Sequence, residues 1–213
     1  MQVTGDSGHV YDVSWRTNEA HFICTCPDFK YRHSHSRDYA CKHIKRCNMP
    51  TPVRSDGRKK RESFLELIGT INSMLKDICQ YEIAGSFRRE KEFIGDLDYV
   101  ILLKSRSDLS ELIERIELIG SINSKGDSRI ISVINEIQCD FRIVPSAQCW
   151  GSMMAHCTGS KEENIRLRIK SKALGFTLNE YGIFGPNGDR IAGITEESIY
   201  TALGKPYKEP KDR

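Results

Sequence analysis

The chain has 213 residues, 38% of them apolar, which allows one domain of good size and a smaller module. Its net charge is +3, but residues 1–61 carry 12 lysine and arginine residues against 6 acidic ones, whereas residues 62–213 carry 20 against 23. The basic N-terminal part predicts either an acidic partner, nucleic acid first, or a basic linker. No run of 18 apolar residues is present, so we expect no membrane span and no membrane partner.

Eight cysteines indicate the cellular setting, because no signal peptide precedes them. We expect a soluble protein in a reducing, intracellular setting, which fits a nucleus as well as a viral factory or virion. In such a setting cysteines are metal ligands or buried thiols rather than disulfides. The eight are Cys24, Cys26, Cys41, Cys47, Cys79, Cys139, Cys149 and Cys157.

Residues 1–48 form a Cys- and His-rich segment in which four side chains have metal-ligand spacing. Cys24-Thr-Cys26 is followed, after fourteen residues, by Cys41-Lys-His43. Three thiolates and one imidazole suit tetrahedral Zn²⁺, so we predict one structural zinc ion held by these four residues.

The pattern of these ligands resembles the SWIM zinc finger over about residues 11–47. The resemblance implies binding of nucleic acid or of a protein partner. Unrelated thiols are the alternative interpretation of the whole cluster. Three further side chains could compete for the metal, and we interpret them as surface or neighbouring residues: His33, His35 and Cys47.

The rest of the chain alternates linker, helix and strand patterns. Residues 49–61 contain two prolines, a glycine and a basic cluster, and predict a basic linker. Apolar residues at helical spacing predict helices over about 63–80 and 109–118. Ser160-Lys-Glu-Glu163 is a capping-box signature that opens a further helix, with Gly175 as its stop. Apolar or alternating runs predict strands at 81–84, 97–104, 129–134 and 136–144.

Two motifs around the strand at 97–104 carry chemistry. Gly85-Ser86-Phe87-Arg88-Arg89 precedes Gly95-Asp96-Leu97-Asp98, which leads into an apolar run. Carboxylates at i and i+2 of a strand point to the same side. Carboxylates can hold divalent metals, while backbone N–H groups and guanidinium can hold a triphosphate. A solvated charged turn before a strand is the alternative.

Asp140 is the candidate for a third carboxylate, which two metal ions about 4 Å apart would need. Alternation in Gln138-Cys-Asp140-Phe-Arg142 places Gln138, Asp140 and Arg142 on one face. An acid in the middle of an apolar strand is costly unless it has a cation or a metal as partner. A plain salt bridge with Arg142, or a wet strand edge, is the alternative.

These motifs resemble the family X DNA polymerases, within the polymerase β-like nucleotidyltransferases, over about residues 63–213. The resemblance implies an α+β fold. Residues 62–147 would form a palm with a mixed or antiparallel sheet and helices, and residues 148–213 a small C-terminal α/β lobe that binds nucleotide and template. Besides the residues above, the matches are Thr158-Gly159-Ser160, Asn164, Arg168, Leu178-Asn179-Glu180-Tyr181 and the tail from Ala202 to Arg213.

The resemblance also implies roles. Asp96, Asp98 and Asp140 would be catalytic and hold two Mg²⁺ ions, for which Mn²⁺ can substitute, with Asp140 on the ion next to the primer 3′-OH. Arg168 would contact the template strand, positioned by Glu180 and Tyr181. The residues implied to bind the incoming nucleotide are Gly85, Ser86, Arg89, Gly95, Thr158, Gly159 and Asn164.

The chain departs from the family pattern in three places. Glu90 stands where the family usually has glycine, and His156-Cys157 stands where polymerase β has a Tyr-Phe pair implied to exclude ribonucleotides. We therefore expect weaker sugar discrimination. Only about 60 residues precede the palm-like region, so we expect no lyase domain and no lyase activity.

From the sequence we expect a monomeric DNA-directed DNA polymerase that adds dNTPs to a primer in gapped or nicked duplex DNA, filling short gaps in repair such as base excision repair. One alternative is a template-independent or RNA-directed nucleotidyltransferase, which template dependence would distinguish. The other is a non-catalytic DNA-binding adaptor, against which the three carboxylates and the Gly-Ser turn argue.

Overall fold

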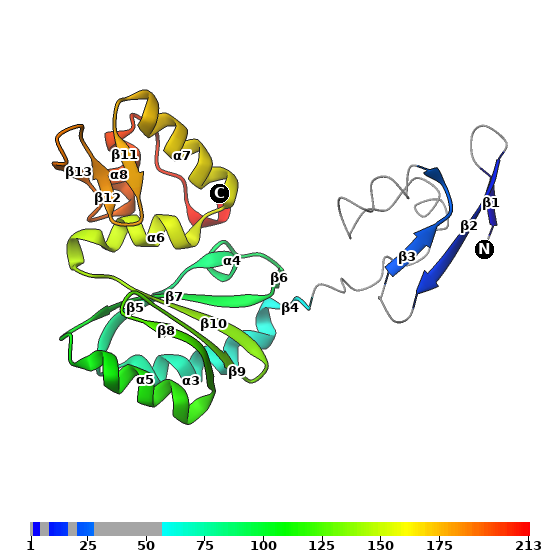
Figure 1. The fold of residues 1–213 in the computed structure, drawn as a ribbon, viewed down its shortest axis with the longest axis horizontal. Coiled ribbons are helices and arrows are strands. Elements are labelled where there is room, and N and C mark those ends of the chain that lie inside the picture. The colour runs from blue at the N-terminus through cyan, green and yellow to red at the C-terminus, as the bar shows by residue number, and fades with distance from the viewer. Residues whose placement is uncertain (1, 5–8, 17–20, 28–56) are drawn as a thin grey trace. The chain divides into compact units, whose positions relative to one another are not determined.

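A computed structural model describes residues 2–4, 9–16, 21–27 and 57–213. The chain divides into two compact units, residues 1–58 and 59–213 (Figure 1). In the first unit, β1 (Gln2–Thr4), β2 (Val10–Arg16) and β3 (His21–Cys24) form an antiparallel sheet in the order β1-β2-β3. Val13 pairs with Cys24 across β2 and β3, and both side chains are buried.

The second unit is built on a five-stranded sheet in the order β5-β7-β10-β9-β8. β7 and β10 are parallel and the other neighbours are antiparallel, so the sheet is mixed, which is one of the two sheet types that the resemblance implied. Two further strands, β4 (Lys59–Lys60) and β6 (Phe93–Ile94), pair with each other beside it. The bounds are β5 (Cys79–Ile83), β7 (Asp96–Leu103), β8 (Ser121–Gly126), β9 (Arg129–Ile134) and β10 (Ile137–Ile143).

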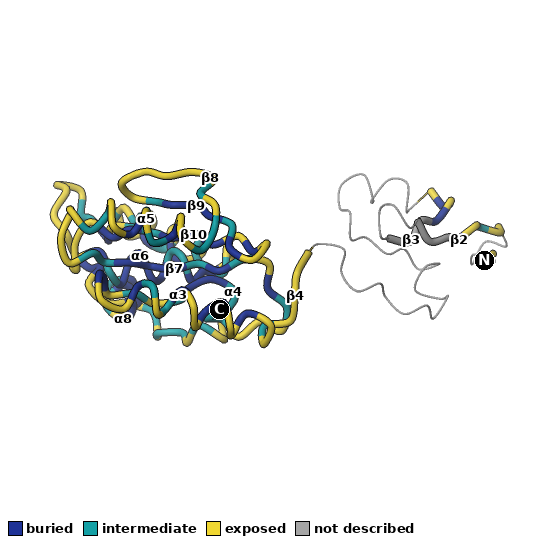
Figure 2. The backbone as a smooth tube through the Cα atoms, turned by 90° about the horizontal axis from the view of Figure 1, so that it is seen from below, coloured by how far each residue is buried: buried dark blue, intermediate teal, exposed yellow. Residues whose placement is uncertain are grey.

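Helices cover both faces of this sheet (Figure 1). The short η1 (Arg61–Phe64) leads into α3 (Leu65–Leu75), which lies with α5 (Asp108–Ile119) on one face. The short α4 (Gly85–Arg88) and α6 (Trp150–Thr158) lie on the other. Buried residues concentrate in the central strands and in the helix faces that cover them (Figure 2).

Strand alternation decides which side chains enter the main core. Leu97, Tyr99 and Ile101 of β7 and Cys139, Phe141 and Ile143 of β10 pack with α3 and α5 in one cluster of buried residues. The residues between them therefore point to the opposite face, where Val100 packs with Met153 and Met154 of α6. Polar side chains on that face lie between the sheet and the α4–α6 layer.

The C-terminal lobe follows η2 (Ala147–Cys149) and begins with α6. It continues through α7 (Lys161–Ala173), the antiparallel strands β11 (Thr177–Asn179), β12 (Gly182–Phe184) and β13 (Arg190–Ala192), α8 (Glu196–Ala202) and η3 (Pro210–Asp212). Leu167, Ile183, Ile199, Tyr200 and Leu203 form its core.

Several predicted elements are confirmed and some bounds are wrong. Ser160 caps α7 by accepting from the Glu163 N–H at 3.3 Å, and Gly175 follows the helix with φ +77°. The predicted helix over 63–80 ends at Leu75, because Cys79 pairs with Leu103 as the first residue of β5. The sequence analysis missed β8, a largely exposed edge strand without apolar alternation. It also missed α6, whose consecutive residues 151–155 are all buried, so that no amphipathic period exists.

Candidate active site

Parallel pairing of β7 and β10 brings the three predicted carboxylates together. In the register, Asp140 lies opposite Asp98 and Gln138 lies opposite Asp96. All three carboxylates point away from the α3–α5 core, as the alternation predicted, and adjacent strands lie about 4.8 Å apart. The result is a group of three acids from two neighbouring strands on one face of the sheet.

Clustering changes the proton affinity of Asp98. Burial, followed by the charges of Asp96 and Asp140, raises the pKa of Asp98 from 3.8 to about 7. Each of these causes disfavours the ionised carboxylate, and each is relieved by a bound cation. Oxygen donors of this kind suit hard divalent ions such as Mg²⁺, so the donor chemistry of the three acids fits the metal that the sequence predicts.

Two arginines contact the third carboxylate, that of Asp140. Arg129 Nε donates to Asp140 Oδ1 at 2.9 Å and Oδ2 at 3.0 Å, and its Nη2 donates to Oδ2. Arg142 Nε lies 3.5 Å from Asp140 Oδ1, which is the salt bridge that the sequence left open as an alternative. Within the part of the chain that the structure describes, no group of three or more His, Cys, Asp or Glu side chains is placed to hold a metal ion.

Sequence reasoning did not single out Arg129. Its side chain shares the site face because Ile130 and Ile134 of β9 enter the α3–α5 core, which turns Arg129 the other way. The alternation of residues 129–134 in the sequence indicates the face of the sheet on which Arg129 lies. The antiparallel register that sets Arg129 opposite Arg142 comes only from the folded sheet.

Gly85 lies directly against Asp98. It begins α4 with φ +58°, and a Cβ at this position would lie 1.9 Å from Asp98 Oδ2. The Ala84 N–H donates to the Asp98 carbonyl at 2.7 Å, which fixes the Gly-Ser motif beside the carboxylates. Only a residue without a side chain fits here, and any larger one would displace Asp98. Ser86 follows within α4, and Gly95 stands between β6 and β7.

Arg88, the last residue of α4, and Arg89, which follows it, both reach the end of α6. Arg89 Nη1 donates to the Thr158 carbonyl, and Arg88 Nη1 donates to Thr158 Oγ1 at 2.7 Å. Arg88 Nη2 also bonds the buried Glu196 of α8 at 2.6 Å. Burial lowers the pKa of Arg89, and its Nε is buried without a hydrogen-bond partner among the described residues. Arg89 therefore keeps an N–H donor that is not used by the described residues. The negative charges of Asp98 and Asp96 favour its charged form.

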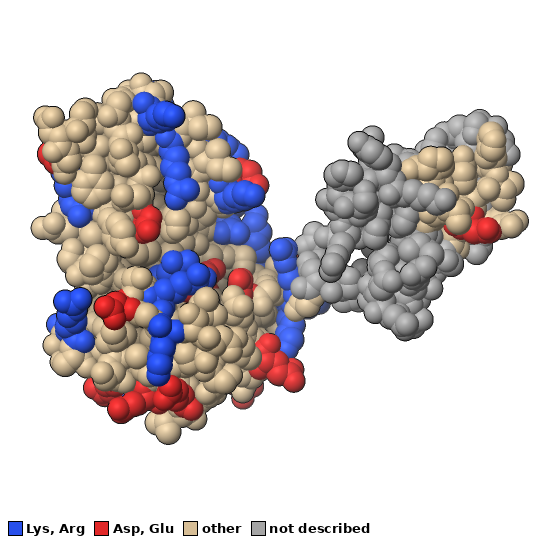
Figure 3. All heavy atoms as spheres, in the orientation of Figure 1, with Lys and Arg blue, Asp and Glu red and all other residues tan. Residues whose placement is uncertain are grey.

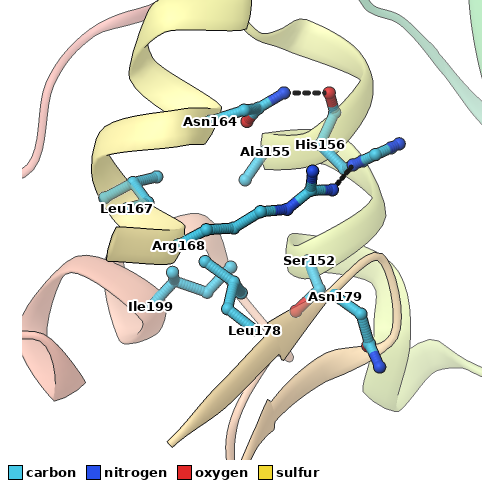
Figure 4. Close-up of a pocket in the computed structure, with 9 residues that line it drawn as sticks. All are labelled: Ser152, Ala155, His156, Asn164, Leu167, Arg168, Leu178, Asn179 and Ile199. Atoms are coloured by element: carbon cyan, nitrogen blue, oxygen red, sulfur yellow. Dashed lines mark hydrogen bonds between the residues drawn. The ribbon is translucent and has the colours of Figure 1, made fainter. Parts of the chain in front are cut away.

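Asn164 and Arg168 converge on His156, which stands at the end of α6 (Figure 4). Asn164 Nδ2 donates to the His156 carbonyl at 2.8 Å, and Arg168 Nη2 lies 3.2 Å from His156 Nδ1. Burial lowers the pKa of His156, which favours the neutral ring. A small pocket between α6, α7 and β11 is lined by these three residues and by Leu167 and Leu178.

Similarity to known proteins agrees with this geometry. Residues 153–213 match the family model described as DNA polymerase beta thumb. The chain is 30% identical over 145 residues to the DNA polymerase/3'-5' exonuclease PolX of Bacillus subtilis, covering 66% of this chain and 25% of that protein. It is 25% identical over 138 residues to the Repair DNA polymerase X of an African swine fever virus isolate, covering 61% of this chain and 78% of the viral protein. The chain is thus similar to family X DNA polymerases.

The chain spans a quarter of the Bacillus relative and more than three quarters of the viral one. Its thumb match begins inside α6 and contains Thr158, Gly159, Asn164 and Arg168. None of the described helices is long and apolar enough to cross a membrane.

Only half of the predicted zinc ligands fall in the described part of the chain. Cys24 ends β3 and Cys26 lies just after it, and both side chains are buried. Cys41 and His43 lie outside the described residues, as do His33, His35 and Cys47.

Proposed function

We propose that this chain is a DNA-directed DNA polymerase of family X that adds dNTPs to a primer 3′-OH in short gaps of duplex DNA. The observation that carries the proposal is the parallel pairing of β7 and β10, which sets Asp96, Asp98 and Asp140 on one face beside Gly85. The named relatives, a PolX and repair polymerases X, support the same reaction.

In this proposal the carboxylates of Asp96, Asp98 and Asp140 would hold two Mg²⁺ ions, with Asp140 serving the ion next to the primer terminus. Bound Mg²⁺ would stabilise the charge that develops on the phosphate oxygens and would lower the pKa of the attacking hydroxyl. The 3′-OH attacks the α-phosphate in line and pyrophosphate leaves. Catalysis then consists of positioning and charge stabilisation.

The surrounding residues supply the positioning. Arg89, whose Nε is buried without a partner among the described residues, and the backbone of Ser86 would hold the β and γ phosphates. Thr158 and Gly159 would lie by the sugar. Gly159 is close to Arg89, because a Cβ on Gly159 would be 3.2 Å from Arg89 Nη1. Asn164 would face the base and Arg168 the template strand.

We further propose that Cys24, Cys26, Cys41 and His43 bind one structural Zn²⁺ in a SWIM-type module. The spacing of the two pairs and the burial of both described cysteines support this. The basic charge of residues 1–61 favours DNA as the partner of this module, and a protein is the alternative.

Primer extension on a one-nucleotide-gapped duplex tests the main proposal. With Mg²⁺ and each dNTP supplied singly, we expect insertion of only the complementary nucleotide, and a loss of about a thousandfold or more in Asp140→Asn. Asp77→Asn is the matched control, since Asp77 lies in the turn between α3 and β5, on the far side of the sheet's core from the carboxylates. Untemplated insertion would favour a terminal transferase, and no insertion by the wild type would favour a DNA-binding adaptor.

A further inference from the structure

We propose that Arg129 is a positioning residue that holds the Asp140 carboxylate in the free protein and exchanges it for a phosphate of the DNA backbone. DNA binding would thereby release Asp140 to the metal. The inference rests on the proposed function, because it assumes that Asp140 is a metal ligand and that DNA lies on this face.

The contact between Arg129 and Asp140 competes directly with a metal. Hydrogen bonds from Nε and Nη2 of one guanidinium engage both carboxylate oxygens, and Arg142 approaches Oδ1 as well. A planar fork of this kind makes charge-assisted hydrogen bonds, which are stronger than those between neutral groups. For Asp140 to bind a divalent ion, at least one of these arginine contacts has to open.

Exposure decides which partner moves. The Asp140 side chain is 7% exposed on a central strand, whereas the Arg129 side chain is 41% exposed at the first position of β9. The carboxylate is fixed by the sheet, but the guanidinium can turn into solvent on a flexible stem without breaking the ladder. Arg129 is therefore the mobile half of the pair.

The register explains why the released arginine needs an anion. Arg129 and Arg142 are directly opposite each other in the antiparallel β9–β10 pair, and like charges in that position repel. In the free protein the Asp140 carboxylate lies between them and compensates this repulsion. Once a metal takes Asp140, both guanidinium groups lose their anion, and a phosphate is the group that restores the balance.

The surface agrees with an anionic ligand. Lysine and arginine side chains gather in the middle of the face drawn in Figure 3, where the C-terminal lobe meets the sheet, with acidic side chains next to them. A DNA backbone on such a surface would contact the cations and leave the acids to metal ions. Metal binding and DNA binding would then be coupled, and by linkage each would strengthen the other.

Binding of Mn²⁺ by the full chain, followed by electron paramagnetic resonance, tests the exchange. It is measured with and without a one-nucleotide-gapped duplex whose primer ends in a dideoxynucleotide, after subtraction of the ions bound by that DNA alone. For the wild type we expect the DNA to raise Mn²⁺ affinity about tenfold or more. For Arg129→Gln we expect about tenfold tighter Mn²⁺ binding without DNA, and a DNA-induced gain reduced to within about twofold.

The control is Lys125→Gln, which removes a positive charge from the neighbouring strand β8, where Lys125 pairs with Glu117 at 3.4 Å. It should behave as the wild type. Arg129→Lys, which keeps the charge but loses the fork, should be intermediate, and it serves if the Gln variant does not fold. Wild-type Mn²⁺ affinity in Arg129→Gln, or an undiminished gain from DNA, would overturn the exchange.

Asp140→Asn separates this inference from the proposed function. If Mn²⁺ binding in the presence of DNA is the same in Asp140→Asn as in the wild type, the proposed metal site itself is wrong. If binding requires Asp140 but does not respond to Arg129, the metal site stands and only the exchange fails.

Discussion

Asp98 is the residue of the site whose charge most reduces the stability of the folded chain. Its side chain is half-buried, lies next to two other acids and is closed in by Gly85 at the start of α4. A buried charge beside like charges costs stability unless a cation compensates it. The protein therefore retains in the free state a group that folding alone would not favour, which is typical of a binding or catalytic site.

The first prediction concerns stability and pH in the metal-free protein. The pKa of Asp98 is about 7 when folded, against 3.8 as the ordinary value, so the folded chain holds the proton more strongly. The contribution of Asp98 to the stability of the folded chain is therefore complete below about pH 4, and it is lost as the pH rises through about 7 and the carboxyl ionises. Asp98→Asn, which cannot ionise, should therefore be more stable than the wild type by about 2–4 kcal/mol at about pH 8, and by less than half of that at about pH 5.

Urea unfolding at the two pH values with a chelator present measures this difference. Asp77→Asn, which replaces an exposed acid in the turn between α3 and β5, is the control. A stabilisation by Asp98→Asn that is equal at both pH values would show that burial of the charge does not cause it.

At the scale of elements, the sequence predicted those whose pattern is periodic. The strands β7, β9 and β10 and the helix α5 bury one face or stripe, and alternation along β10 correctly placed Asp140 on the face opposite Cys139 and Phe141. The helix α7 was predicted from its capping box instead. Arg129 as the partner of Asp140 could not be predicted, because a contact between side chains on different strands depends on register. The buried helix α6 and the polar edge strand β8 lack a period to detect.

The junction of α6 and α7 departs from the pattern of the polymerases that the chain resembles. His156, which stands where the resemblance to polymerase β implies an aromatic residue, receives a hydrogen bond from Asn164 on its carbonyl and lies beside Arg168. Cys157 follows it, and its side chain is partly exposed. The pair therefore leaves less bulk beside Thr158 than the family's two aromatic rings would.

The second prediction follows from this smaller bulk and concerns choice of sugar. In single-turnover insertion opposite G, the preference of the wild type for dCTP over CTP should be lower than that of the double variant His156→Tyr, Cys157→Phe by about tenfold or more. A matched control is Cys149→Ala, a buried thiol at the other end of α6. Equal preferences in the wild type and the double variant would mean that the junction does not select the sugar.

At the scale of the whole molecule, the chain joins two compact units of different charge. The unit that holds the carboxylates, residues 59–213, is neutral overall, with 23 lysine and arginine residues against 23 acidic ones. A unit without net charge gains little from its net field when it approaches DNA. The basic residues of the N-terminal part are therefore the natural source of a general attraction to phosphate.

The third prediction is that residues 1–57 supply much of the affinity for DNA. Deleting them should weaken binding of a gapped duplex by about tenfold or more at moderate salt, and should make the dependence of affinity on salt concentration less steep, because fewer counterions are released. Fluorescence anisotropy across a series of salt concentrations gives both quantities. An unchanged slope would contradict a role of the N-terminal part in phosphate contacts and would favour a protein as its partner.

A point variant distinguishes the charge of this segment from its fold. Cys26→Ser keeps every lysine and arginine but removes one of the four proposed zinc ligands, so bound zinc, measured by mass spectrometry of the metal, should fall by about one ion per chain. If affinity for DNA then falls as far as in the deletion, a folded zinc module makes the contacts. If zinc is lost and affinity is kept, the basic residues act as a charged segment that needs no metal, because the electrostatic attraction depends on their number rather than on their arrangement.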